Sequence, residues 1–193
     1  MKIIGLTGSI ATGKSFVAEI FRRRNIEVFS SDAAVGDILK EKEVINIIKN
    51  DRFLKEVIKN DIIDKELLSN LVFKDLKLLE ILENILHPLV AKKRDEFFLK
   101  NNKYGILEVP LLFEKNYQVL CDKVITTYCS DKTQIERALR RKNIDKNRLN
   151  FIIKRQMPGN IKAKHTDYLV YTDISYEYTE KQIDEILSKE GIK

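Results

Sequence analysis

The stretch Gly8-Ser9-Ile10-Ala11-Thr12-Gly13-Lys14-Ser15 matches the phosphate-binding loop pattern G-x-x-x-x-G-K-[ST]. It follows the short apolar run Lys2 to Thr7, which is typical of a buried parallel strand. After the loop, Val17, Ile20 and Phe21 recur at helical spacing. A phosphate-binding loop lies between a strand and a helix, and both are predicted here. The sequence therefore predicts a site for nucleotide phosphates at this loop.

Each residue type in the loop has a physical task. Glycine at Gly8 and Gly13 lets the backbone curl, so that successive N–H groups point at phosphate oxygens beside the positive end of the following helix. Lys14 would reach the β- and γ-phosphates, and Ser15 would offer its hydroxyl to Mg²⁺. Because kinases, GTPases and motor ATPases share such loops, the reaction has to be inferred from other residues.

Strand and helix patterns alternate along most of the chain. Further strands are predicted at residues 27–30, 106–109, 123–128 and 168–171, with capped helices after Ser130 and Asp145. From about 38 to 100 there is almost no strand signal, so we expect a helical insertion that Pro88 interrupts by starting a new helix. The alternation predicts an α/β fold with a parallel sheet.

Composition narrows the classes of protein. The 193 residues suit one domain, and 35 Lys and Arg against 29 Asp and Glu give a net charge of +6. The basic residues are spread out and not interleaved with aromatic ones, so we expect no nucleic-acid partner. We see no signal sequence or membrane span, and Cys121 and Cys129 match no zinc motif, which favours the cytoplasm. The charge keeps one alternative open, a regulatory or RNA-associated protein that holds ATP without transferring phosphate.

Asp32 is the candidate for the reacting base. It follows the second predicted strand, and parallel strands deliver their carboxyl ends to one edge of the sheet. A carboxylate there could accept the proton of an attacking hydroxyl, as kinases require. The alternative is an ordinary N-cap of a helix that starts at Ala33.

Three more charged residues are candidates. Glu108 stands at a strand end near the loop, where it could support a metal ion, or else it faces solvent at a sheet edge. Arg137 and Arg141 are four residues apart on a predicted helix and share one face. They could close over nucleotide phosphates together, or they could form a solvated face.

Several segments resemble the dephospho-CoA kinase family. Besides the loop and the early Asp32, they are His87-Pro88-Leu89-Val90, Val109-Pro110-Leu111-Leu112-Phe113-Glu114, Glu136 to Arg141, Gln156-Met157-Pro158 and Lys164 to Tyr168. Their order and spacing match, and the likeness covers nearly the whole chain. The loop is shared by many families, whereas P-L-L-F-E joined to H-P and Q-M-P is far more specific.

The resemblance implies a three-layer P-loop NTPase fold with a parallel sheet, a helical CoA-side insertion near 38–100 and a helical lid near 130–156. It implies transfer of the γ-phosphate of ATP to the ribose 3′-hydroxyl of dephospho-CoA, with Mg²⁺ as cofactor and these two small molecules as partners. We expect a monomer or weak homo-oligomer. The second hypothesis is another small-molecule P-loop kinase, with a different acceptor pocket.

The resemblance also assigns roles to individual residues. Asp32 would be the base, and Lys14 and Arg141 would complete the catalytic set. The remaining contacts are expected at Gly8, Ala11, Thr12, Gly13, Lys14, Ser15, Phe16, Arg137 and Arg141 for ATP, at Asp32, His87, Leu111, Leu112, Phe113 and Glu114 for the acceptor, and at Ser15 and Glu108 for Mg²⁺. Thr172 departs from the family, since it lies near an expected asparagine.

Overall fold

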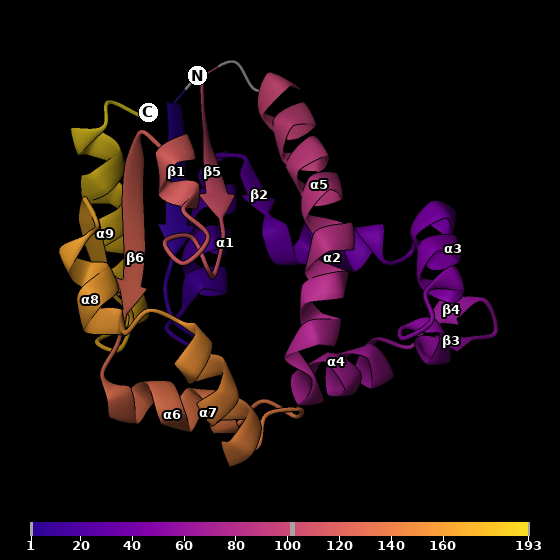
Figure 1. Cartoon of the computed structure of the whole chain (residues 1–193). Helices are drawn as coiled ribbons and strands as arrows, with labels where there is room; N and C mark the ends of the chain where they lie inside the picture. The colour runs from indigo at the N-terminus through magenta and orange to yellow at the C-terminus, as the bar shows by residue number, and fades with distance from the viewer. Residues whose placement is uncertain (1, 101–102, 193) are drawn as a thin grey trace. The chain divides into compact units, whose positions relative to one another are not determined.

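The computed structural model describes residues 2–100 and 103–192, and the chain divides into two compact units (Figure 1). Unit 1 comprises Met1–Ser30 and Asn101–Lys193, and unit 2 is Ser31–Lys100. The described elements of unit 1 are β1 (Lys2–Thr7), α1 (Lys14–Arg23), β2 (Val28–Ser30), β5 (Tyr104–Glu108), the 3-10 helix η2 (Tyr117–Leu120), β6 (Lys123–Tyr128), α6 (Asp131–Leu139), α7 (Lys146–Arg155), α8 (Gly159–Lys164), β7 (Tyr168–Tyr171) and α9 (Tyr176–Lys189). Those of unit 2 are α2 (Ser31–Ile38), α3 (Lys42–Asn50), the 3-10 helix η1 (Lys55–Val57), β3 (Ile58–Lys59), β4 (Ile62–Ile63), α4 (Lys65–Lys74) and α5 (Leu76–Lys100).

The sheet of unit 1 is parallel, with strand order β2-β5-β1-β6-β7. β1 is central and pairs with β5 on one side and β6 on the other. Because parallel strands end at the same edge, the loops that leave β1, β5 and β6 lie together there. The predicted α/β class, a parallel sheet flanked by helices, is confirmed.

Helices α1 and α9 pack on one face of this sheet (Figure 1). Ile4 and Leu6 of β1 point toward them, and both side chains are fully buried. On the other face a Cβ on Gly5 would lie 2.8 Å from Leu112 Cδ1 and 2.8 Å from Cys121 Sγ. The segment that follows β5 therefore packs directly on the backbone of β1, and only glycine allows this approach.

The predicted helix caps at Ser130 and Asp145 are also confirmed. Ser130 accepts a hydrogen bond from Thr133 N at the start of α6, and Asp145 accepts one from Arg148 N at the start of α7. Such caps satisfy N–H groups that a helix leaves unpaired. α9 ends before Gly191, which has a φ of 69°, the left-handed conformation that favours glycine after a helix.

The prediction that His87-Pro88 starts a new helix is wrong. α5 runs without interruption from Leu76 to Lys100, with Pro88 inside it. Leu82 and Leu86 before the proline are buried in the core of unit 2, and Leu89 and Val90 after it pack against the same core. This packing offsets the hydrogen bond that proline removes, so one apolar face continues through the position.

Unit 2 also contains a small hairpin that the sequence analysis missed. β3 and β4 pair antiparallel, and Asn60 and Asp61 between them have φ values of 50° and 57°. Two consecutive residues with positive φ define the tight hairpin turn in which Asn and Asp are favoured. The Asn60-Asp61 pair between Ile58-Lys59 and Ile62-Ile63 was therefore the available signal, although strands of two residues are too short to show a period.

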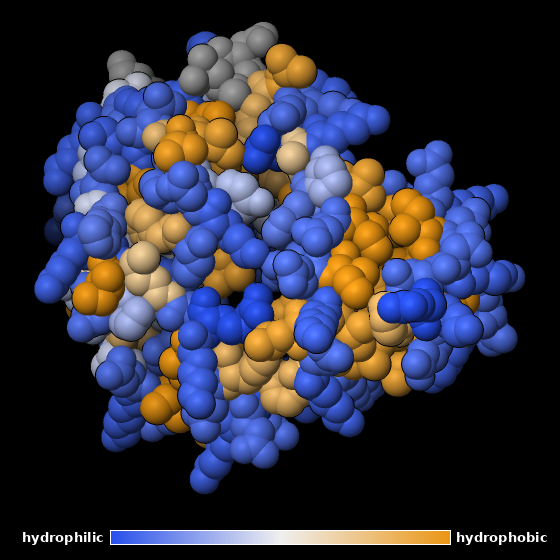
Figure 2. All heavy atoms as spheres, in the orientation of Figure 1, coloured by the Kyte–Doolittle hydropathy of each residue, from blue (hydrophilic) through white to orange (hydrophobic). Residues whose placement is uncertain are grey.

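The visible surface is mostly hydrophilic, with hydrophobic side chains gathered over unit 2 (Figure 2). Exposed apolar residues of that unit include Ile47, Phe53 and Ile62. Within residues 2–100 and 103–192, no helix combines the length and the hydrophobicity that crossing a membrane requires.

Candidate active site

The loop between β1 and α1 has the curled backbone of a phosphate-binding loop. Gly8 and Gly13 have φ values of 153° and 93°, and Ala11 has a φ of 60°. Gly13 is the N-cap of α1, so the first N–H groups of that helix face the loop. Lys14 Nζ donates to Gly8 O over 3.0 Å, which folds the lysine side chain back across the loop. The loop thus brings together backbone N–H groups and one cation, which are the groups that bind an anion at a helix start.

Hydrogen bonds between threonines fix the loop to the ends of the neighbouring strands β6 and β7. Thr12 Oγ1 donates to Ser9 O at 2.8 Å and lies 2.8 Å from Thr127 Oγ1. Thr172 Oγ1 donates to Thr12 O at 2.8 Å. All three threonines are less than 9% exposed, and buried hydrogen bonds of this kind fix backbone geometry. Thr172, the departure from the family pattern, therefore anchors the loop in this chain.

Gly8→Ala is expected to unfold the loop. The new Cβ would lie 2.1 Å from Thr127 Oγ1 and 2.6 Å from Thr12 Oγ1, at a φ that disfavours other residues. We expect a loss of about 3 kcal/mol or more in the free energy of unfolding, together with loss of ATP binding. Thermal denaturation and an ATP titration would check both.

Gly36→Ala in α2 is the matched control. The nearest atom to its Cβ would be Lys65 Nζ at 3.7 Å, and alanine is the better helix former, so stability should rise by about 0.5–1 kcal/mol. If Gly8→Ala kept wild-type stability and ATP affinity, this description of the loop would be wrong.

A cavity of about 300 Å³ opens beside the loop within unit 1. Its charged lining residues are Lys14, Arg137 and Arg141, and all three are cations. Arg137 donates through Nη1 to Thr172 Oγ1 at 3.1 Å and through Nη2 to Thr172 O at 2.8 Å. Arg141 lies beyond α6, which ends at Leu139, so the prediction that both arginines belong to one helix is wrong, and Arg141 is exposed. The predicted pair therefore shares the cavity, where positive charge favours a polyphosphate, and the solvated-face alternative is wrong for Arg137.

An aromatic pair also lines this cavity. Phe16 and Tyr176 both line it, and their ring centroids lie 4.9 Å apart in an edge-to-face arrangement. Tyr176 is 72% exposed, whereas tyrosine side chains in folded proteins are more often partly buried. The cavity lining thus combines cations, which suit phosphates, with aromatic rings, which suit a flat apolar group.

Two glutamines, which the sequence analysis did not single out as site residues, hold the peptide of Ile10. Gln156 Oε1 accepts from Ile10 N at 2.8 Å, and Gln134 Nε2 donates to Ile10 O at 2.9 Å. Ile10 and Ala11 are buried against Ala138 of α6 and Leu149 of α7. Helices α6 and α7 are therefore bonded to the phosphate-binding loop itself. Gln156 had a signal in the Gln-Met-Pro segment, whereas Gln134 had none.

Glu108 ends β5 and is 8% exposed. It lies in register with Leu6 of β1 and with Ser30 of β2, so it belongs to an inner strand. The alternative of a solvent-facing charge at a sheet edge is therefore wrong. Its carboxylate stands at the carboxyl-terminal edge of the sheet, one strand from the phosphate-binding loop.

Asp32 lies in the first turn of α2 and is exposed. α2 begins at Ser31, directly after β2, so the alternative of an N-cap before Ala33 is wrong. His87 lies in the middle of α5 and is half-buried.

Four acceptor contacts were predicted in the segment after β5, and the side chains of two of them point into the protein. Leu112 is fully buried, and Glu114 pairs with Lys162 of α8. Leu111 and Phe113 are half-buried and keep part of their surface accessible. Burial lowers the pKa of Lys162, while the charge of Glu114 opposes that shift.

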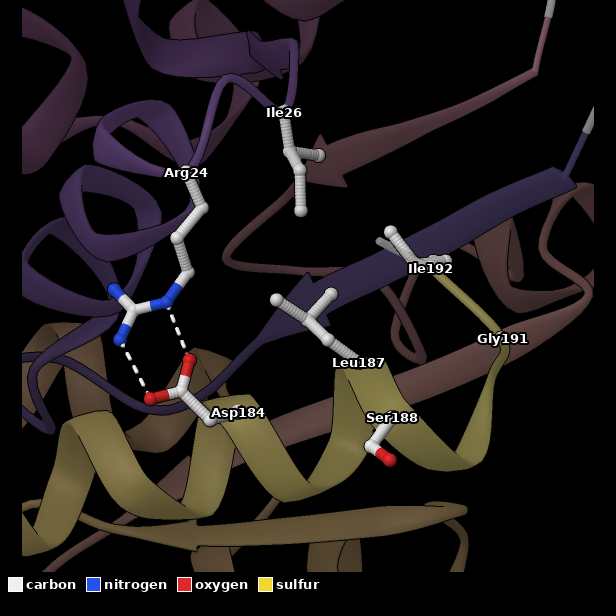
Figure 3. Close-up of a pocket in the computed structure, with 7 residues that line it drawn as sticks. All are labelled: Arg24, Ile26, Asp184, Leu187, Ser188, Gly191 and Ile192. Carbon is white, nitrogen blue, oxygen red and sulfur yellow. Dashed lines mark hydrogen bonds and ion pairs between the residues drawn. The ribbon is translucent and has the colours of Figure 1, made fainter.

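A second hollow of about 490 Å³ lies between the end of α1 and α9 (Figure 3). Arg24 donates to both carboxylate oxygens of Asp184, at 2.5 and 2.9 Å, and Leu187 and Ile192 form the apolar side. The hollow contains no residue of the phosphate-binding loop. Its cation Arg24 is paired with Asp184, so it offers no anion site comparable with the first cavity.

The chain is similar to known proteins along its whole length. The sequence profile described as dephospho-CoA kinase matches residues 2–177. A dephospho-CoA kinase of Bartonella quintana (strain Toulouse) is 35% identical, with 97% of each chain covered. A solved dephospho-CoA kinase from Campylobacter jejuni is 30% identical with full coverage of both chains and a TM-score of 0.68. A solved protein from Thermus thermophilus is 28% identical, with 97% of each chain covered and a TM-score of 0.83.

The parallel sheet, the loop at the end of β1 and the cationic cavity beside it define a P-loop kinase, which transfers phosphate from ATP. The match over residues 2–177 and the 35% identity then fix the family. This chain belongs to the dephospho-CoA kinase family.

Proposed function

We propose that this chain transfers the γ-phosphate of ATP to the 3′-hydroxyl of the ribose of dephospho-CoA, which yields CoA and ADP. The observation that carries the proposal is the cavity lined by Lys14, Arg137 and Arg141 beside the loop, in a chain that matches this family over nearly its whole length. The fold alone would support many acceptors, so the acceptor rests on the family.

ATP is proposed to lie with its phosphates on the loop. The N–H groups from Ala11 to Phe16, including those of Thr12 and Gly13, would donate to phosphate oxygens, beside the backbone of Gly8. Lys14 would leave Gly8 O and turn to the β- and γ-phosphates. Arg137 and Arg141 would stabilise the charge that shifts during transfer. The edge-to-face rings of Phe16 and Tyr176 would receive the base.

Ser15 and Glu108 fit a role at Mg²⁺. Ser15 is exposed in the first turn of α1 at the cavity, and Glu108 ends the neighbouring strand. Hydroxyl and carboxylate oxygens are hard ligands, and Mg²⁺ usually takes one or two such protein ligands besides phosphate oxygens. When bound, Mg²⁺ neutralises phosphate charge. Ser15 and Glu108 would keep it at the edge of the sheet.

On the acceptor side, Asp32 is proposed to accept the proton of the 3′-hydroxyl. His87 and residues Leu111, Leu112, Phe113 and Glu114 are proposed to bind or shape the acceptor region, with Leu111 and Phe113 offering accessible surface. The helical region near 38–100 would be the CoA side, and α6 and α7, within residues 130–156, would be the lid. In the described part of the chain neither Cys121 nor Cys129 forms a disulfide, which suits the reducing cytoplasm that we propose as location.

The decisive experiment is ADP formation from ATP and Mg²⁺ with different acceptors. Dephospho-CoA should support turnover, whereas CoA, which differs only by a phosphate on the reacting hydroxyl, should not. Adenosine and AMP test the alternative of a nucleoside or nucleotide kinase. Turnover with these but not with dephospho-CoA would contradict the proposed acceptor, and ATP binding without acceptor-dependent turnover would favour a regulatory protein.

A further inference from the structure

Lys162 is a lysine with no exposed surface, on the short helix α8. Its Nζ donates to Pro110 O at 2.8 Å and lies 3.1 Å from Glu114 Oε1. Burying an ammonium group costs several kcal/mol unless good partners replace its water. Lys162 therefore ties α8 to the segment that follows β5 by a charge–charge contact and a backbone hydrogen bond.

Glu114 holds more than this lysine. Its Oε1 also accepts from Met157 N at 2.6 Å. Its Oε2 is buried, and among the described residues it has no hydrogen-bond partner. Burying a carboxylate costs free energy, and an oxygen without a hydrogen bond leaves much of that cost uncompensated. This ion pair is therefore poorly suited to add stability. Its geometry instead fixes the position of Met157.

The residue before Met157 reaches the phosphate-binding loop. Gln156 is the C-cap of α7, and its Oε1 accepts from Ile10 N at 2.8 Å. Since adjacent residues share a peptide plane, holding Met157 N also orients the carbonyl side of Gln156. One route of direct contacts thus runs from Lys162 and Glu114 through Met157 and Gln156 to Ile10.

A second route reaches the start of the same loop. Pro110 O accepts from Lys162 Nζ and also from Thr7 Oγ1, at 3.2 Å. Thr7 is the last residue of β1 and directly precedes Gly8. The next residues of the loop include Ala11, whose positive φ costs free energy unless neighbouring contacts enforce it. The contacts of Thr7 and Ile10, on the two sides of Ser9, help to enforce the loop conformation in this way.

We propose that Glu114 and Lys162 are positioning residues that hold the phosphate-binding loop in its nucleotide-binding shape through Gln156 and Thr7. The inference deepens the proposed function and rests on the loop as the ATP site, but it does not depend on which acceptor is used. It also separates Glu114 from a direct acceptor contact.

The test measures the affinity for Mg·ADP by titration calorimetry, without any acceptor. The variants are Glu114→Ala, Gln156→Ala and the double variant, and melting curves confirm that each is folded. Gln156→Ala removes a hydrogen bond to the loop, and Glu114→Ala removes the contact that positions Gln156 through Met157, so Mg·ADP binding should weaken by about tenfold in each single variant. Because both residues act along one route, the double variant should be within about threefold of the weaker single variant.

Asp184→Ala is the matched control, since it removes a carboxylate from the Arg24 pair of Figure 3, away from the loop. Its affinity for Mg·ADP should be unchanged. Effects that multiply to about a hundredfold in the double variant would overturn the shared route. Unchanged Mg·ADP affinity in Glu114→Ala, with a raised KM for dephospho-CoA, would overturn the proposal in favour of an acceptor contact.

A second variant keeps the test valid if Glu114→Ala does not fold. Glu114→Leu combined with Lys162→Met replaces the buried charges by apolar groups of similar length, which should restore folding. Met157 N still loses its partner and Pro110 O keeps only Thr7 Oγ1 of its two donors, so Mg·ADP affinity should remain about tenfold lower. Wild-type affinity in this folded double variant would show that the pair serves stability alone and would refute positioning.

Discussion

Lys14→Met is expected to lower kcat/KM for ATP by about a thousandfold while leaving the fold intact. Methionine keeps the length and apolar stem of lysine but removes the ammonium group. In the structure that group is 3.0 Å from Gly8 O, so it spans the loop at the place where phosphates are proposed to bind. Steady-state kinetics with varied ATP would measure the loss, and a melting curve would confirm folding.

Lys181→Met is a suitable control for this experiment. Lys181 is exposed on α9 and does not line the cavity beside the loop, so its replacement should leave the kinetics unchanged. Lys14→Arg should not restore full activity, because a planar guanidinium cannot take the place of a compact ammonium group between two phosphates. A Lys14→Met enzyme within threefold of wild type would contradict the assignment of the loop as the site of transfer.

The loop could be predicted from sequence because its signals are local. Eight consecutive residues specify the curled backbone, and the apolar runs on either side specify the strand and helix that present it. The same holds for the caps Ser130 and Asp145, where one side chain satisfies a backbone group three residues away. Patterns of this kind need no knowledge of the rest of the chain.

The features that could not be predicted depend on contacts outside the local sequence. Proline breaks helices in general, but packing in the core of unit 2 keeps α5 continuous through Pro88, and that packing joins residues from several elements. The bond between Gln156 and Ile10 joins residues 146 positions apart. Lys162 lies on a six-residue helix that also contains Asn160 and Lys164, so it has the pattern of a surface residue. Its burial follows from Glu114 and Pro110, which no local pattern connects with it.

Asp32→Asn is expected to lower kcat with dephospho-CoA by about 10²–10⁴-fold, with the KM values nearly unchanged. Asparagine keeps the shape of the side chain and can still accept a hydrogen bond, but it cannot take up a proton. Asp32 is exposed in the first turn of α2, so the replacement buries no unpaired group. Its cost in stability should not exceed the loss of a favourable helix-end charge, about 0.3–1 kcal/mol.

Asp37→Asn separates base catalysis from the general effect of charge on α2. Asp37 lies on the same helix, is exposed and pairs with Lys40 at 2.7 Å, which keeps the pKa of its carboxyl below the usual value. Removing that carboxylate should leave kcat unchanged.

If Asp32→Asn and Asp37→Asn lost activity equally, the loss would come from the changed charge of α2 and not from a missing proton acceptor. If Asp32→Asn lost less than tenfold, Asp32 would orient the acceptor by a hydrogen bond, and another group or solvent would take the proton. A large loss confined to Asp32 would show that proton acceptance at this position limits phosphate transfer.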